Sequence, residues 1–184
     1  MTDNDARHDN SATAAMIFML AVFTLGFLAG AMIWQRTSAD DGWGRLLLRT
    51  ADYASCDSFA LALRYSLTPS VPIFAVLTVC GYFVFGWIVA PAAVFYRAVG
   101  FGALTCCLFS GASGAGLGGA ALTVVPGAAT ALIIVFLARD AAVSSAGFFA
   151  GYREKRSGFV LRALLSAVLF TAAALLQAAA CVLR

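Results

Sequence analysis

The sequence predicts an all-α membrane protein, a polytopic helix bundle that crosses the bilayer about five times. Of its 184 residues, 62% are hydrophobic and 11% are charged, and the mean hydropathy is +0.90. Soluble domains are roughly 45–50% apolar and about 25% charged, and a soluble fold of this size could not bury the excess. Charged residues also separate uncharged runs long enough for membrane spans. We expect a polar tail at residues 1–13 and a single membrane domain at residues 14–184.

The first expected span covers residues 14–34 and ends at Trp34, a residue type common at membrane interfaces. Its Gly26-x-x-x-Gly30 spacing is typical of helices that approach one another closely. A cleaved signal peptide is the alternative, because Ala29-Gly30-Ala31 resembles a peptidase site. The length of the apolar run favours a retained membrane anchor.

Residues 35–70 form the only sizeable polar stretch, and from Arg45 onward apolar residues recur on one helical face. This pattern predicts an external amphipathic segment on the membrane surface or against the bundle. The next span is expected at residues 73–90. Prolines such as Pro72 and Pro91 mark the two ends of this span.

The uncharged run from Ala98 to Ala138 would be about 60 Å long as one helix, twice the thickness of a bilayer. It must therefore fold back, and we place the break in the Gly/Pro-interrupted segment at residues 111–126. Two versions remain open for this part of the chain. In both, a span at 98–112 leads into the break; the next span is then 116–138, or 126–150 after a re-entrant element. A last span is expected at 163–183.

Basic residues favour the cytoplasmic side of a membrane, and the densest basic cluster lies between Arg153 and Arg162. This cluster predicts that the 139–162 loop and the N-terminus are cytoplasmic. The 35–70 segment and the C-terminus are then outside. We expect the cytoplasmic (inner) membrane of a bacterium.

The sequence carries no recognisable catalytic apparatus. Ser113 and its small neighbours resemble the nucleophile motif of rhomboid intramembrane proteases, whose base is a His on a later membrane helix. Here the single histidine, His8, precedes the first span, so we predict that the protein is not an enzyme. The five cysteines form no Cys-x-x-Cys pair and have no histidine nearby, which argues against a metal site, and no cofactor is expected. The net charge of +3 is too scattered for a nucleic-acid partner.

Small residues are the strongest positive signal. They form three Gly-x-x-x-Gly pairs, Gly26 with Gly30, Gly114 with Gly118 and Gly147 with Gly151. Such pairs let helix backbones approach within the chain or between copies of a homo-oligomer, with the lipid bilayer around them.

Two polar features fall near the membrane interior. Gln177 lies in the last span, and Arg139-Asp140 interrupts the run from Pro126 to Gly151. If that run is one helix, the pair lies deep, and each residue needs its own partner because adjacent residues do not share a helix face. Structural roles are favoured over transport roles for both features.

Several features of the region from Phe59 to Leu183 are shared with one known family. They include Ser58-Phe59, Gly81, Gly86, the run from Phe95 to Gly102, the cluster Gly116-Leu117-Gly118-Gly119, Pro126, the basic loop Arg153–Arg156 and the final span. The chain thereby resembles the stage II sporulation protein M family. The resemblance implies functional positions at Arg97, Gly100, Gly102, Pro126 and Gln177. Members commonly carry a polar residue after the proline and an acidic residue in the last span, where this chain has Gly127 and Gln177.

The resemblance implies a non-enzymatic membrane scaffold that organises partner proteins. The namesake holds cell-wall-degrading partners at the septal membrane during engulfment, so the partners expected here are membrane or envelope proteins. The alternative hypothesis is a membrane subunit of a transporter, with a site at the broken-helix region. A water-accessible cavity at the break would favour transport, and a tightly packed bundle would favour a scaffold.

Overall fold

The structure is a computed structural model, and it describes residues 3–36, 59–68, 70–110, 117–149 and 156–182. All regular secondary structure within these ranges is α-helical. Four stretches are long and apolar enough to cross a membrane: Ser11–Arg36, Gly86–Phe109, Thr123–Ala146 and Gly158–Ala179. The prediction of a polytopic helical membrane bundle is confirmed. The helices are α1 (Asp3–Arg36), α3 (Phe59–Leu67), α4 (Val71–Cys80), α5 (Gly86–Phe109), α6 (Leu117–Phe149) and α7 (Arg156–Val182).

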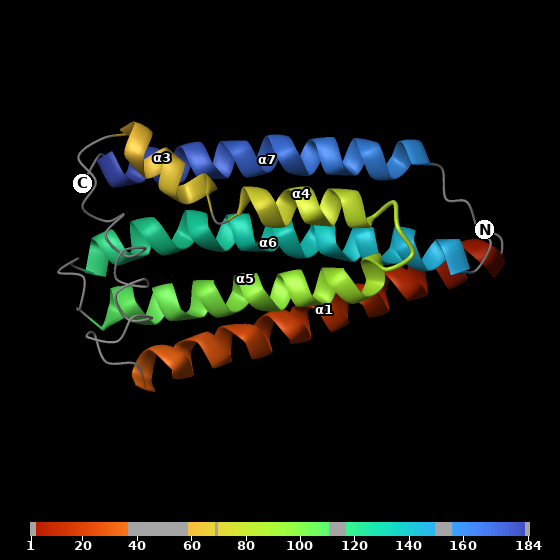
Figure 1. The fold of residues 1–184 in the computed structure, drawn as a ribbon, viewed down its shortest axis with the longest axis horizontal. Coiled ribbons are helices and arrows are strands. Elements are labelled where there is room, and N and C mark those ends of the chain that lie inside the picture. Colours follow the sequence, from red (N-terminus) through yellow and green to blue (C-terminus); the bar gives the residue numbers. More distant parts are fainter. Residues whose placement is uncertain (1–2, 37–58, 69, 111–116, 150–155, 183–184) are drawn as a thin grey trace.

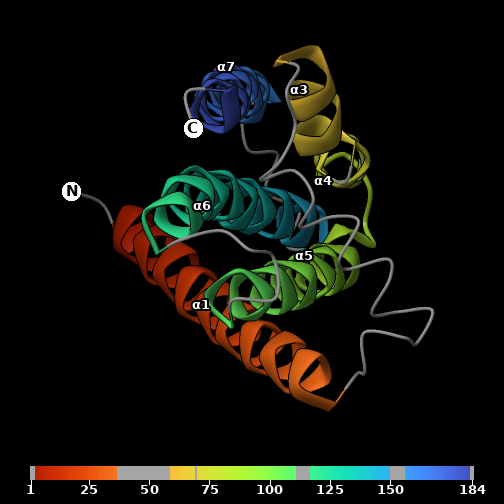
Figure 2. The same cartoon turned by 90° about the vertical axis from the view of Figure 1, so that its left-hand side faces the viewer.

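Helix α6 lies in the middle of the bundle and contacts α1, α4, α5 and α7 (Figures 1 and 2). Helix α1 packs obliquely along α5, and the short helix α3 packs against α7. Helices α1, α5 and α7 begin at the same end of the bundle, where α4 and α6 end (Figure 1). We call this the α1-start end, and the end where α7 finishes the α7-finish end.

The second expected span, residues 73–90, is wrong as a single helix. Helix α4 ends at Cys80, five residues form a turn, and α5 begins at Gly86. The third expected span, 98–112, is therefore only the later part of α5, which also contains Pro91. The chain instead runs from the α7-finish end towards the α1-start end through α3 and then α4 (Figure 1). The predicted end of the span at Pro91 was wrong because proline can lie inside a membrane helix when its surroundings satisfy the backbone groups that it frees.

The expected interruption as far as Pro126 is also wrong for the part that the structure describes, because α6 runs without a break from Leu117 to Phe149. Within these residues no re-entrant element exists, and one helix replaces both alternatives, 116–138 and 126–150. Arg139 and Asp140 lie inside this helix rather than in a 139–162 loop. The polar tail is not separate either, since α1 begins at Asp3.

The core of the bundle is apolar and centred on α6. Ile134 and Ala138 of α6 belong to the same buried cluster as Leu77 of α4 and Val94 of α5. Large side chains instead cover the outside of α1 and α7, where they are exposed in the isolated chain: Ile17, Phe18, Leu25, Leu28, Leu161, Leu164, Leu165 and Val168. This distribution suits a molecule whose surroundings are lipid.

Candidate functional site

A direct backbone contact joins α1 and α5. A Cβ atom added to Gly26 would lie 2.8 Å from the Cβ of Ala98, and one added to Gly30 would overlap the carbonyl oxygen of Val99. From the other side, a Cβ on Gly102 would overlap the carbonyl oxygen of Phe27. The two backbones therefore touch directly, because each helix has a glycine where the other approaches.

A further predicted packing glycine, Gly118, makes no such contact with the described part of the chain, where a Cβ added to it would meet no heavy atom within 4 Å. Gly147 lies in α6. Its expected partner Gly151 falls outside the described residues, and so does Gly114.

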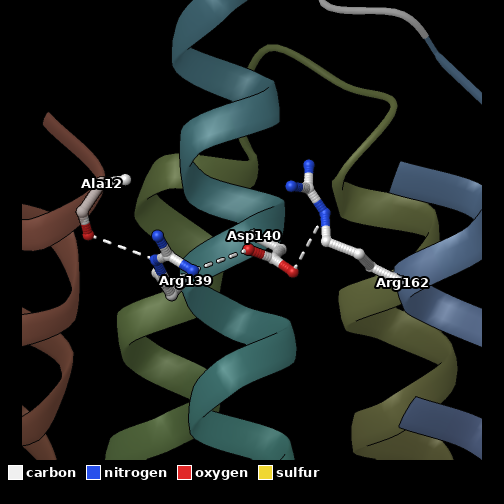
Figure 3. A network of polar contacts seen from close by, with 4 residues as sticks. All are labelled: Ala12, Arg139, Asp140 and Arg162. Carbon is white, nitrogen blue, oxygen red and sulfur yellow. Dashed lines mark hydrogen bonds and ion pairs between the residues drawn. The ribbon is translucent and has the colours of Figure 1, made fainter. Parts of the chain in front are cut away.

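A polar network connects three helices near the α1-start end (Figure 3). The Nε of Arg139 donates a hydrogen bond to the carbonyl oxygen of Ala12 on α1 at 3.2 Å. Its Nη1 lies 3.4 Å from Oδ1 of Asp140, and Oδ2 of the same carboxylate lies 3.4 Å from Nε of Arg162 on α7. Each of the two adjacent α6 residues thus has a partner on a different helix, as expected. The two side chains also form an ion pair with each other, which was not expected of neighbours on one helix.

The network lies near one boundary of the apolar stretches. Ala12 is one residue beyond the start of the stretch Ser11–Arg36, and Arg162 is four residues beyond the start of Gly158–Ala179. Asp140 is six residues before Ala146, the end of the α6 stretch, which corresponds to about 9 Å along the helix axis. These charges therefore lie near one end of the apolar stretches, and the ends of a membrane span are where ionised side chains cost least.

Ser145 of α6 holds the turn between α4 and α5. Its hydroxyl, fully buried, donates a hydrogen bond to the carbonyl oxygen of Val84 at 2.9 Å. It also accepts one from the backbone N–H of Trp87 at 3.2 Å. Gly86 lies against Ser145, because a Cβ atom added to the glycine would be 3.0 Å from the serine Cβ. One serine thus satisfies two backbone groups that the interruption between α4 and α5 leaves without a helical partner.

The same turn presents a group of aromatic side chains. Phe83, Phe85 and Trp87 are exposed in the isolated chain. Tyr82 makes an edge-to-face contact with Phe159 of α7, with 5.4 Å between the ring centroids. Exposed aromatic residues of this kind are typical of membrane interfaces. Ser145 and Phe159 lie within one or two turns of Asp140 and Arg162, so the aromatic turn and the polar network indicate the same membrane boundary.

The positions implied by the family resemblance are spread over three helices. Arg97 lies half-buried in the middle of α5, not between two spans as expected. Gly102 contacts α1, whereas a Cβ on Gly100 would meet no heavy atom of the described residues within 4 Å. Pro126 lies inside α6, and Gln177 is half-buried in α7.

Comparison of the chain with protein-family models, with curated proteins and with solved structures finds no match. Within the described ranges, no group of three or more His, Cys, Asp or Glu residues could hold a metal ion. Among the described residues, the polar network and the Ser145 turn join different helices through polar contacts. The sequence marks Arg139 and Asp140 as unusual, but it gives no sign of their partner Arg162 or of Ser145. A single serine among small residues carries no signal that distinguishes it from Ser144.

Proposed function

We propose that the protein is a non-enzymatic membrane scaffold, which anchors and organises membrane or envelope proteins at the cytoplasmic membrane. The resemblance to the stage II sporulation protein M family motivates this proposal. The observation that carries it is the direct backbone contact between α1 and α5 at Gly26, Gly30 and Gly102. A contact without room for a methyl group is suited to a rigid anchor, because it leaves the two helices no freedom to slide past one another.

The course of α6 also favours a scaffold over a transporter with a site at a helix break between residues 111 and 126, because α6 continues through Pro126. Gly127, next to this proline, faces the ring of Phe101 on α5, and a Cβ atom added to the glycine would be 3.0 Å from the ring. This part of α6 is therefore in packing contact with its neighbour.

In the proposed orientation, the α1-start end faces the cytoplasm. Helix α6 ends and α7 begins at this end of the bundle, and the sequence between and at these helix ends contains the basic residues Arg153, Lys155 and Arg156. Two further basic residues, Arg139 and Arg162, lie at the same end. The C-terminus and residues 37–58, which fall outside the described residues, are then on the external side, where we place the contacts with partners.

Photo-crosslinking in cells tests the scaffold proposal. A photoreactive amino acid at Trp43, in the expected external segment, should give adducts with discrete proteins that mass spectrometry identifies. The same group at Leu165, exposed on α7, is the control and should react with lipid. Lipid adducts alone from both positions would contradict a scaffold whose external segment binds partners.

A transporter subunit remains the second candidate, supported by a different break. Helices α3 and α4 form a discontinuous helix, interrupted between Leu67 and Val71. Ser70, at the start of α4, is 1% exposed, and its hydroxyl has no hydrogen-bond partner among the described residues. In many transporters, the N-terminus of a discontinuous membrane helix points at the substrate and forms part of its binding site.

Proteoliposome flux distinguishes the two candidates. A transporter should move a solute across the membrane of vesicles that contain the purified protein, and Ser70→Ala should reduce that flux. Thr78→Val is a matched control, because the Thr78 hydroxyl donates a hydrogen bond within its own helix, to the carbonyl oxygen of Phe74 at 2.9 Å. A flux that is equal in wild type, in both variants and in empty vesicles favours the scaffold.

A further inference from the structure

We propose that the turn between α4 and α5 is an interfacial anchor, whose aromatic side chains bind the headgroup and ester layer of the phospholipid leaflet at the α1-start end of the bundle. The partner is thus the boundary between the polar and apolar layers of a lipid surface. This inference goes beyond the proposed function, because it holds for a scaffold and for a transporter, and for either orientation of the bundle.

The composition of the turn is unusual for a connection between two helices. Four of the six residues at positions 82–87 are aromatic, and residues 65–96 include no charged one. Phe83, Phe85 and Trp87 are 59%, 69% and 51% exposed in the isolated chain. Turns that face water are normally built from Gly, Pro, Asn, Asp and Ser. The aromatic composition therefore indicates that a less polar medium surrounds this turn.

The backbone of the turn is suited to such a medium, because the protein itself satisfies its polar groups along most of its length. Backbone N–H groups donate hydrogen bonds of 3.0–3.2 Å to carbonyl oxygens of the turn or of the adjoining helices: those of Gly81, Tyr82, Phe83, Gly86, Ile88 and Val89. Ser145 adds the N–H of Trp87 and the carbonyl oxygen of Val84 to this set. Since unsatisfied backbone groups are costly away from water, this hydrogen bonding allows the turn to enter the interfacial layer.

The turn lies where three apolar stretches reach their ends (Figure 1). Ser145, which binds the turn, is one residue before Ala146, the end of the α6 stretch. Phe159, which contacts the turn from α7, is one residue after Gly158, the start of the α7 stretch, and the α5 stretch begins at Gly86. Tryptophan and tyrosine favour this depth, because the ring borders the hydrocarbon while its N–H or O–H group bonds to the polar layer.

Contacts with two other helices hold the turn in one position. A Cβ atom added to Gly81 would overlap the ring of Phe159, a residue that is 2% exposed, so the end of α4 lies directly against α7. The same ring contacts the edge or face of Tyr82, and Ser145 binds the turn from α6. An anchor held in this way fixes the depth of α4 and α5, since a shift of either helix along the membrane normal would carry the aromatic side chains out of the interface.

The fluorescence of a single tryptophan in phospholipid vesicles tests the proposal. The full chain has three tryptophans, so the double variant Trp34→Phe with Trp43→Phe retains only Trp87. Lipids brominated near the ester groups should quench Trp87 more strongly than lipids brominated near the ends of the acyl chains, and aqueous iodide should quench it less than it quenches a free tryptophan amide. Stronger quenching by the deep bromines, or iodide quenching equal to that of the free amide, would overturn the proposal.

A tryptophan in the middle of a span is the matched control. Leu132→Trp, in a chain whose three native tryptophans are replaced by Phe, places the probe on α6, nine residues from Thr123 and fourteen from Ala146. The side chain at this position is exposed in the isolated chain. This probe should be quenched more strongly by the deep bromines than by the shallow ones. The same depth profile for Leu132→Trp and for Trp87 would contradict an interfacial position of the turn.

A further variant tests whether the anchor is held at a fixed depth. In the chain that retains only Trp87, Ser145→Ala frees two backbone groups of the turn to bind water, and iodide quenching of Trp87 should increase. Ser144→Ala, the less buried neighbour, should leave the quenching as it is in the parent chain. Equal iodide quenching in Ser145→Ala and Ser144→Ala would overturn the fixed depth of the anchor.

Discussion

Gly30 of α1 lies directly against the carbonyl group of Val99 of α5, so closely that a single added methyl group would overlap it. Four residues further along α5, the backbone nitrogen of Ala103 lies 3.0 Å from the same Cβ position. Backbone atoms, unlike flexible side chains, cannot move aside without displacing a whole helix. The stability of the bundle should therefore be unusually sensitive at this glycine.

We predict that Gly30→Ala destabilises the protein by about 1–3 kcal/mol, as overpacking does in well-packed cores. Gly100→Ala is the control, since a Cβ there would meet no heavy atom of the described chain within 4 Å. This control should be neutral or stabilising by up to about 1 kcal/mol, because alanine is the better helix former. Thermal unfolding of both variants in the same detergent measures the difference. If Gly30→Ala melts at or above the temperature of Gly100→Ala, the two helices do not touch as described.

Asp140 should be the most sensitive residue of the polar network. Asp140→Asn removes the negative charge that lies between Arg139 and Arg162, and we expect a loss of about 1–3 kcal/mol because it weakens two partly buried ion pairs. Arg162→Gln should cost less, about 0–1 kcal/mol, because its side chain is 44% exposed. Urea or thermal unfolding in detergent provides both values. A larger loss for Arg162→Gln than for Asp140→Asn would show that the carboxylate is not the centre of the network.

Ser145→Ala should loosen the turn between α4 and α5. The substitution leaves the carbonyl oxygen of Val84 and the N–H of Trp87 without the hydroxyl that binds both, at a cost of about 1–3 kcal/mol for buried polar groups. Ser144→Ala, the adjacent and less buried serine, is the control. Hydrogen exchange of residues 82–88 should accelerate in Ser145→Ala and remain as in wild type for Ser144→Ala. Unchanged exchange in both would mean that another group holds the turn.

Reporter fusions test the orientation. A phosphatase fused after Tyr152 should be inactive, because we place the connection between α6 and α7 in the cytoplasm, and one fused after Arg184 should be active outside. The reason is the cluster of basic residues near Tyr152, which favours the cytoplasmic side. A cytosolic fluorescent reporter at the two positions should give the reverse pattern. The opposite result for both reporters would invert the bundle, and the same result at both positions would mean that α7 does not cross the membrane.

The sequence predicted the class of the fold and one of its contacts. Hydropathy and the spacing of charges predicted a helical membrane bundle, and a helix contact was expected at Gly26 and Gly30, where α1 meets α5. It could not predict where the second crossing is interrupted. Pro91 and Pro126 suggest helix ends, but both lie within helices, while the observed turn after Cys80 contains no proline or charge at all.

What the sequence determined by itself is the solvent of this protein: 62% hydrophobic residues with 11% charged ones require lipid around the helices. What only the tertiary structure decided is how the few polar groups are satisfied. Ser145 completes a turn that is distant in the sequence, and Arg162 reaches Asp140 from another helix. The physical reason is that the transfer of a segment into lipid depends on the amino-acid composition of that segment, which can be read directly from its sequence. A hydrogen bond between helices depends on the rotation and depth of both, which their packing sets.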